Sequence, residues 1–160
     1  MRANSDLSEL VDHHQIQALV AGLAHAQDRR EWAAMATLFA PRVDLDLSSV
    51  FGGKPLVTSA DELAGMAQAA LEGFDVTHHA ATNLVTQIDG DNANARAHVY
   101  SYHQLAMEPG VTDYCLMRGF WEFHLTKASG RWLISRWAVV RTGPWDGDPD
   151  LYGVAAARRK

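Results

Sequence analysis

Residues 76–107 read VTHHAATNLVTQIDGDNANARAHVYSYHQLAM, and this stretch decides the fold. It holds two long runs with β-branched and aromatic residues, 76–88 and 93–107, on either side of Asp89-Gly90-Asp91. Runs of this kind around a tight turn are typical of a β-hairpin. The stretch therefore predicts a pair of unusually long antiparallel strands.

The same pattern continues downstream in residues 113–127 and 131–142. Their separators, Glu108-Pro109-Gly110 and Ala128-Ser129-Gly130, also have turn chemistry. Four long strands joined in this way form an antiparallel meander. Strands of this length coil strongly, so we expect the sheet to curve around a pocket.

Apolar residues upstream of the strands fall at helical spacing. This spacing predicts helices over 6–27 and 30–39, the second ending near Pro41. Residues 43–47 then alternate apolar and acidic side chains, as a half-buried strand does. Helices that precede the strands favour an α+β fold, with the helices on one face of the sheet.

A third helix is predicted over 59–73. Ser59 and Glu62 form a capping box in which each side chain can bond the other's backbone N–H. Gly73 is expected to end this helix in a left-handed turn. The fold class is therefore α+β, with a curved antiparallel sheet packed against three N-terminal helices.

The length and composition fit one globular domain over residues 1–160, with its core at about 7–142. The tail, 143–160, lacks periodicity but carries large aromatic residues that are costly to expose. We expect the tail to pack over the domain, and Trp145, Leu151 and Tyr152 to close the pocket or to fill its open end.

Charge and cysteine usage limit the classes of partner. The net charge of -5 and the scattered Lys and Arg residues provide no basic field for nucleic acid. Cys115 is the single cysteine, and no Cys or His pair has zinc-site spacing, so neither a disulfide nor a metal site is predicted. Without an apolar run of membrane-spanning length, we expect a soluble cytoplasmic protein that does not bind membranes.

The best candidate for chemistry is a carboxylate and an imidazole, Asp28 and His79. Such a pair can move a proton at neutral pH, because the carboxylate fixes the tautomer of the ring and stabilises its charged form. A cap for the second helix is an equally good interpretation of Asp28. His78 and His79 must point to opposite faces of their strand, and His79 shares its face with Asn83.

Five segments in order resemble the scytalone dehydratase branch of the SnoaL-like families, within the nuclear-transport-factor-2-like group. These are residues 28–32, 39–46, 77–79, 102–105 and 130–132, and the resemblance covers about residues 7–152. The segment His79-Ala80-Ala81-Thr82-Asn83 is also similar to a piece of hexachlorocyclohexane dehydrochlorinase. The resemblance implies a cone-shaped, cystatin-like α+β fold.

The resemblance also implies roles for residues. Asp28 and His79 would form the catalytic dyad, with His79 as the base, and His103 would line the pocket as an acid or polar contact. The family chemistry is elimination of water or chloride, which needs no cofactor. The two named relatives are trimers, so a homo-oligomer, trimer or dimer, is implied.

The sequence departs from the dehydratase pattern at four pocket positions. Gln27 and Leu47 stand where two water-holding tyrosines are expected, and Gly119 and Trp121 replace a serine and an asparagine. The substrate pocket, for which we select Gln27, Leu47, Asn83, Trp121 and Trp145, is therefore drier, and scytalone is not the expected substrate.

We accordingly predict a cofactor-independent lyase, a dehydratase or dehydrohalogenase, that acts on a small hydrophobic cyclic or polyketide-like molecule. Two alternatives stay open. A double-bond isomerase of the ketosteroid isomerase type would use the same dyad, and the fold also occurs in domains that only bind a small ligand.

Overall fold

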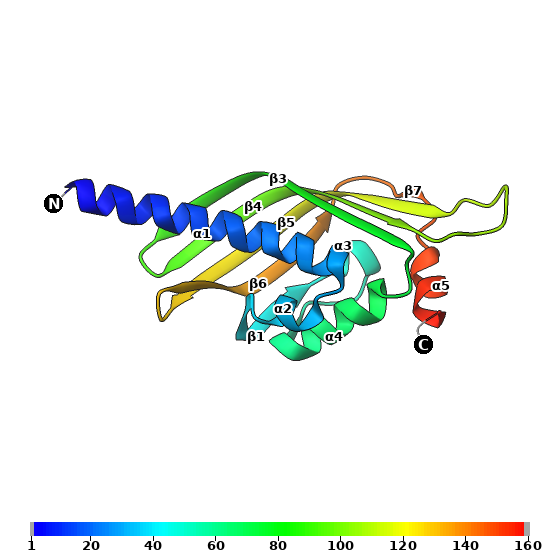
Figure 1. Cartoon of the computed structure of the whole chain (residues 1–160), viewed down its shortest axis with the longest axis horizontal. Coiled ribbons are helices and arrows are strands. Elements are labelled where there is room, and N and C mark those ends of the chain that lie inside the picture. The colour runs from blue at the N-terminus through cyan, green and yellow to red at the C-terminus, as the bar shows by residue number, and fades with distance from the viewer. Residues whose placement is uncertain (1, 159–160) are drawn as a thin grey trace.

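The computed structural model describes residues 2–158, in which one seven-stranded sheet curves around a layer of helices (Figure 1). The elements in chain order are α1 (Arg2–Arg29), α2 (Trp32–Ala36), β1 (Phe39–Asp46), α3 (Ser48–Phe51), β2 (Leu56–Ser59), α4 (Ala60–Leu71), β3 (Val76–Asp89), β4 (Asn92–Gln104), β5 (Tyr114–Ala128), β6 (Arg131–Arg141), β7 (Asp146–Gly147) and α5 (Leu151–Ala157).

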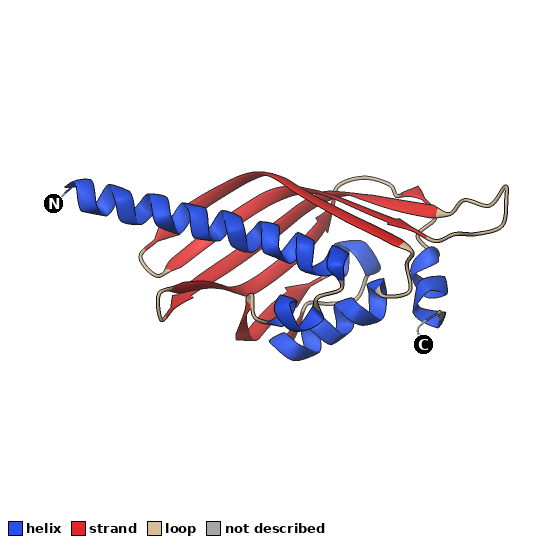
Figure 2. Cartoon of the chain, in the orientation of Figure 1, coloured by secondary structure: helices blue, strands red, loops and turns tan. Residues whose placement is uncertain are grey.

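The sheet is an antiparallel meander with additions at two places. Its strands are ordered β2-β1-β6-β5-β4-β3, and β7 pairs with β5. All pairings are antiparallel except β1 with β6, which is parallel. Helices α1 to α4 gather on one side of the sheet (Figure 2). The predicted α+β class with a curved sheet is confirmed.

The four long predicted strands are present as β3, β4, β5 and β6, with ends within three residues of the expected ones. Their turns use the expected chemistry, since Gly90, Gly110, Ser129 and Gly130 all have positive φ. Along β4 buried and exposed residues alternate strictly from Asn92 to Ser101. The hydrophobic period therefore specifies the register of this strand and the face that it buries.

Helix α1 lies across the sheet, and its N-terminal turns extend beyond the sheet edge (Figure 1). Its buried residues, Ile16, Leu19, Val20 and Leu23, share one core with the alanines of β4. A polar anchor adds to this packing, because Lys127 and the Trp132 indole both donate to Asp12, at 2.6 Å and 2.9 Å. Helix α1 is therefore fixed on strands β4, β5 and β6.

Several predicted boundaries are wrong in the N-terminal half. Helix α1 runs four residues further toward the N-terminus than predicted, and α2 is only five residues long. Phe39 opens β1 instead of closing a helix, and Pro41 lies in that strand where the pairing with β6 is irregular, so its missing N–H is tolerated. Helix α3 and strand β2 were not predicted.

Helix α4 has the predicted start and a different end. The capping box is present, with Glu62 N–H bonded to Ser59 Oγ at 3.2 Å and Ser59 N–H bonded to Glu62 Oε2 at 3.0 Å. Gly73 does not adopt the expected left-handed conformation. Instead, a Cβ at this position would lie 1.9 Å from the carbonyl oxygen of Ala155, so the glycine allows α5 to approach closely.

The tail is ordered into β7 and α5, which the lack of periodicity did not predict. Leu151 and Ala155 are buried in a second apolar cluster with Leu71, Phe74 and Leu105. Residues 159 and 160 of the predicted tail lie outside the described residues. None of the helices in residues 2–158 combines the length and the hydrophobicity that a membrane span requires.

Candidate active site

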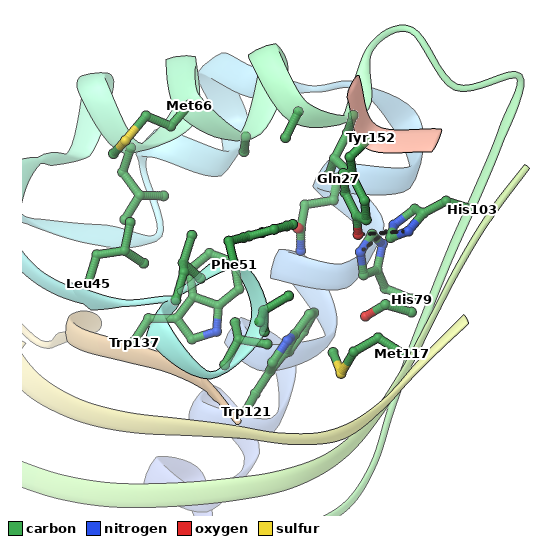
Figure 3. Close-up of a pocket in the computed structure, with 18 of the residues that line it drawn as sticks. Gln27, Leu45, Phe51, Met66, His79, His103, Met117, Trp121, Trp137 and Tyr152 are labelled. Carbon is green, nitrogen blue, oxygen red and sulfur yellow. Dashed lines mark hydrogen bonds between the residues drawn. The ribbon is translucent and has the colours of Figure 1, made fainter. Parts of the chain in front are cut away.

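A pocket of about 100 Å³ lies between the curved sheet and helices α3, α4 and α5 (Figure 3). Its lining is mostly aliphatic and aromatic. The polar residues of the lining are Gln27, His79, Ser101, His103 and Tyr152, together with tryptophans Trp121, Trp137 and Trp145. Among the residues that the structure describes, no Lys, Arg, Asp or Glu lines this pocket. The pocket therefore suits an uncharged, largely apolar molecule.

The polar residues gather at one end of the pocket. Figure 3 shows Gln27, His79, His103 and Tyr152 near one another, with Leu45, Met66 and Trp137 toward the opposite end. His79 comes from β3 and His103 from β4, and Tyr152 comes from α5. Ser101 is the cross-strand partner of His79 and is also buried. Gln27 comes from α1, so four elements bring the polar groups to one place.

Asp28 and His79 form a tight pair that is held at two points. The ring nitrogen Nδ1 of His79 lies 2.7 Å from Oδ1 of Asp28, and the backbone N–H of His79 donates to Oδ2 at 2.9 Å. The His79 side chain is 4% exposed and that of Asp28 is 19% exposed. Both carboxylate oxygens are therefore engaged, and the ring cannot rotate freely.

The position of Asp28 at the end of α1 explains its direction. Arg30, the first residue after α1, has a positive φ of 59°, which ends the helix just beyond Asp28. The cap position of α2 is occupied by Glu31, and no side chain bonds the first turn of α2. Asp28 therefore does not cap α2, which removes the structural alternative that the sequence left open.

The environment keeps Asp28 ionised. Burial raises the pKa of its carboxyl group, but the hydrogen bonds from the ring and backbone N–H of His79 outweigh burial and lower the pKa below its ordinary value. An ionised Asp28 accepts from Nδ1–H of His79, so the lone pair of the neutral ring is on Nε2.

His103 extends the pair into a chain of four side chains. Its Nε2 lies 3.3 Å from Nε2 of His79, and its Nδ1 lies 2.9 Å from the hydroxyl oxygen of Tyr152. Burial lowers the pKa of His103 well below its ordinary value. His103 is therefore neutral at physiological pH.

Four of the five predicted pocket residues line the pocket: Gln27, Leu47, Trp121 and Trp145. Gln27 is buried, and its side-chain N–H donates to the carbonyl of Leu23 at 3.1 Å. The carbonyl oxygen of its amide is thereby left as an acceptor for a bound molecule.

The prediction for Asn83 is wrong. Asn83 is exposed, has a φ of 52° and bonds His98 at 3.1 Å. The pairing of β3 with β4 shifts register between Thr82 and Val85, so the alternation that places His79 toward the pocket does not extend to Asn83. The alternation of strand faces, counted from His79, therefore does not continue through this bulge.

Sequence reasoning did not select Ser101 or Trp137 for the pocket, and it treated Tyr152 only as part of a closing tail. Ser101 shares a strand face with His103, which was a usable signal. No sequence signal connects Tyr152 with His103, because their contact depends on how α5 docks.

Cys115 is buried outside the pocket, and burial raises the pKa of its thiol to about 12. In residues 2–158, no three His, Cys, Asp or Glu side chains gather as a metal site requires.

The fold and site define a small α+β domain that holds an aspartate–histidine pair at the edge of an apolar pocket. The family model for the SnoaL-like domain matches residues 8–138. The chain belongs to this family, which confirms the resemblance stated from the sequence. No protein of curated function matches the sequence significantly.

Solved structures of low sequence identity share this fold. The Kfla4162 protein of Kribbella flavida has a TM-score of 0.82 and 24% identity, over 92% of this chain and 98% of that one. A scytalone dehydratase-like protein of Novosphingobium aromaticivorans has a TM-score of 0.71 and 19% identity, over 85% and 87% of the two chains. The LinA-type3 hexachlorocyclohexane dehydrochlorinase of Novosphingobium barchaimii has a TM-score of 0.71 and 17% identity, over 90% and 94%.

Proposed function

We propose that this protein is a cofactor-independent lyase that eliminates water or a hydrogen halide from a small, neutral, hydrophobic cyclic molecule. The observation that carries this proposal is the buried Asp28–His79 pair, joined at 2.7 Å at the edge of an apolar pocket. The names of two structural neighbours, a scytalone dehydratase-like protein and a dehydrochlorinase, are consistent with elimination.

His79 is the proposed base. Because Asp28 accepts from Nδ1–H, the lone pair of His79 is on Nε2, where it can remove a proton from a substrate carbon. The electron pair of the broken C–H bond forms the new C=C bond, and the leaving group departs with its own electron pair. The nearby carboxylate of Asp28 stabilises the imidazolium that results.

His103 is the proposed polar contact for the leaving group or for an oxygen beside it. A departing hydroxide can take the proton from His79 and leave as water, whereas a halide leaves as the anion and His79 later returns its proton to solvent. No redox step or electron acceptor is needed. The reaction therefore requires only His79 and His103 of the pocket, with Asp28 behind His79.

The lining favours a particular class of substrate. An uncharged wall would leave a substrate carboxylate or phosphate without a partner, and such burial is costly. A cavity of about 100 Å³ is smaller than the engineered cavity of about 150 Å³ that binds benzene, so its size limits a substrate to at most a single ring. We therefore propose a neutral substrate built on a single ring, with Gln27 and Ser101 available for its polar groups.

The test compares two neighbouring histidines on opposite faces of β3. His79→Ala is incubated beside wild type with a panel of hydroxylated, halogenated and unsaturated single-ring compounds, and release of water or halide is followed. The matched control is His78→Ala. His78 is exposed, whereas the adjacent His79 is buried, so the same substitution at residue 78 leaves the pocket unchanged.

We expect wild type and His78→Ala to eliminate from at least one compound, and His79→Ala to lose about 10² to 10⁴ in rate. Equal rates for wild type and His79→Ala would refute the role of His79. Migration of a double bond without loss of water or halide would identify an isomerase instead. Binding of panel compounds without turnover by wild type would contradict the proposed lyase activity.

A further inference from the structure

The two pocket histidines face each other through the same atom. Nε2 of His79 and Nε2 of His103 lie 3.3 Å apart, and the Nδ1 atom of each ring has a different partner. Asp28 bonds Nδ1 of His79, and Tyr152 bonds Nδ1 of His103. The ionised carboxylate of Asp28 can only accept a hydrogen bond, whereas the hydroxyl of Tyr152 can donate one.

Counting the protons along this chain gives one consistent arrangement for the neutral rings. Asp28 holds the His79 proton on Nδ1, so Nε2 of His79 has a lone pair. The opposite tautomer of His103 would place a second lone pair against it at 3.3 Å. His103 must therefore carry its proton on Nε2, which leaves Nδ1 as an acceptor for the Tyr152 hydroxyl.

Burial makes this arrangement hard to exchange for another. His103 is 1% exposed, and burial raises the pKa of Tyr152 well above its ordinary value, so the phenol keeps its proton. A buried hydroxyl that lost His103 as acceptor would be left unsatisfied, which is costly. The ring of Phe74 packs against both His103 and Tyr152, at centroid distances of 5.1 Å and 5.2 Å.

The docking of α5 determines where the hydroxyl lies. Leu151 and Ala155, on either side of Tyr152, are buried, and Gly73 leaves room for the backbone of Ala155. The Tyr152 ring also makes edge contacts with Phe51 and Trp145, at 5.0 Å and 5.9 Å. The C-terminal helix is thus part of the support of the active site.

We propose that Tyr152 is a positioning residue that holds His103 in the Nε2–H tautomer and so makes it a hydrogen-bond donor to the substrate. Asp28 and Tyr152 would give two similar imidazoles opposite tasks, since His79 presents a lone pair and His103 presents an N–H. This inference rests on the proposed lyase activity and specifies the part of His103 in it.

The long contact between the two rings suits this task. At 3.3 Å between the two nitrogens, the contact lies at the long end of hydrogen-bond distances, so the bond is weak. A substrate hydroxyl, carbonyl or halogen can replace His79 as the acceptor of the His103 N–H. That exchange frees Nε2 of His79 to take the substrate proton, and His103 itself gives up no proton.

The direct test is ¹⁵N NMR of protein labelled in histidine, since protonated and unprotonated ring nitrogens have well-separated shifts. Comparison with His103→Gln identifies the His103 signals. We expect wild-type His103 to be neutral at pH 7 with its proton on Nε2. A proton on Nδ1 would overturn the proposal, because Tyr152 would then be the acceptor.

The kinetic test is Tyr152→Phe, which keeps the ring and removes only the hydroxyl. We expect kcat to fall about tenfold with little change in KM, as for the loss of one hydrogen bond in the transition state, and the Nδ1 signal of His103 to shift. The control is Tyr100→Phe, because Tyr100 is 49% exposed and outside the pocket. Unchanged kcat in Tyr152→Phe would overturn the proposal.

The two proposals fail in different ways. The tautomer of His103 is measured without any substrate, so it can be judged even if no panel compound is turned over. Turnover that depends on His79 but not on Tyr152 would sink this inference and leave the lyase proposal intact. Thermal unfolding of Tyr152→Phe near the wild-type midpoint would show that α5 still docks.

Discussion

Replacement of Asp28 by asparagine is a severe test of the dyad, because the structure dictates how the new amide must turn. The backbone N–H of His79 lies 2.9 Å from Oδ2 and needs an acceptor, so the amide oxygen of Asn takes that place. The amide NH₂ group then faces Nδ1 of His79, where the carboxylate oxygen lies at 2.7 Å in wild type. A donor at this position forces the His79 proton onto Nε2.

The expected effect on catalysis is large and the effect on folding is small. The forced tautomer removes the lone pair that accepts the substrate proton, so we expect kcat/KM to fall about 10² to 10⁴, or about 3 to 5 kcal/mol in transition-state free energy. Both hydrogen bonds can re-form, because the His79 backbone N–H still donates to the side-chain oxygen and the Asn N–H donates to Nδ1 of the ring. The midpoint of thermal unfolding should therefore stay within a few degrees of wild type.

The assay is initial-rate kinetics on a compound that wild type converts, together with ¹⁵N NMR of His79. The matched control is Asp44→Asn, because Asp44 is exposed on β1 and outside the pocket. If Asp28→Asn keeps more than about a tenth of the wild-type kcat/KM, His79 is not acting as the base, since general-base catalysis contributes far more than that. A His79 proton that stays on Nδ1 in this variant would also refute the reasoning.

Two further predictions concern the elements that support the site. Asp12→Ala should lower the free energy of unfolding by about 2 to 3 kcal/mol in urea titrations, because the buried Trp132 indole and the partly buried Lys127 ammonium lose their acceptor. The hydrogen bond from Lys127 lowers the pKa of Asp12 below its ordinary 3.8, so this contribution should be complete above about pH 4 and lost as the pH falls through the lower folded-state pKa. If the free energy of unfolding fell equally with decreasing pH in Asp12→Ala and wild type, this role of Asp12 would be contradicted. Gly73→Ala should destabilise the protein by about 1 to 3 kcal/mol, because its Cβ would meet the Ala155 carbonyl. The control Gly65→Ala, which meets nothing within 4 Å, should be neutral or stabilising.

The long strands could be predicted from the sequence because local signals agree there. Along β4 apolar and polar residues alternate, and Gly90 provides the positive φ that its turn requires. The boundaries of α2 and β1 could not be predicted from the sequence, because the local sequence signals conflict there. Phe39 and Pro41 look like the end of a helix, and only pairing with β6 makes them strand.

Some residues of the candidate site could also be predicted from the sequence, and others could not. Strand alternation placed His79 on the face opposite His78, and the family resemblance selected His79 and His103 among eight histidines. Asn83 could not be assigned, since a bulge depends on the pairing of two strands. Tyr152 could not either, because its place against His103 depends on the packing of α5, 49 residues away in the chain.

The most direct test of the central claim is transfer of hydrogen between the substrate carbon and His79. A compound that wild type converts is incubated in D₂O with wild type, His79→Ala and His78→Ala, and its C–H signal is followed by NMR. We predict that wild type and His78→Ala remove that hydrogen at similar rates, and that His79→Ala removes it about 10² to 10⁴ more slowly. Equal loss of the C–H signal with His79→Ala and wild type would contradict the account.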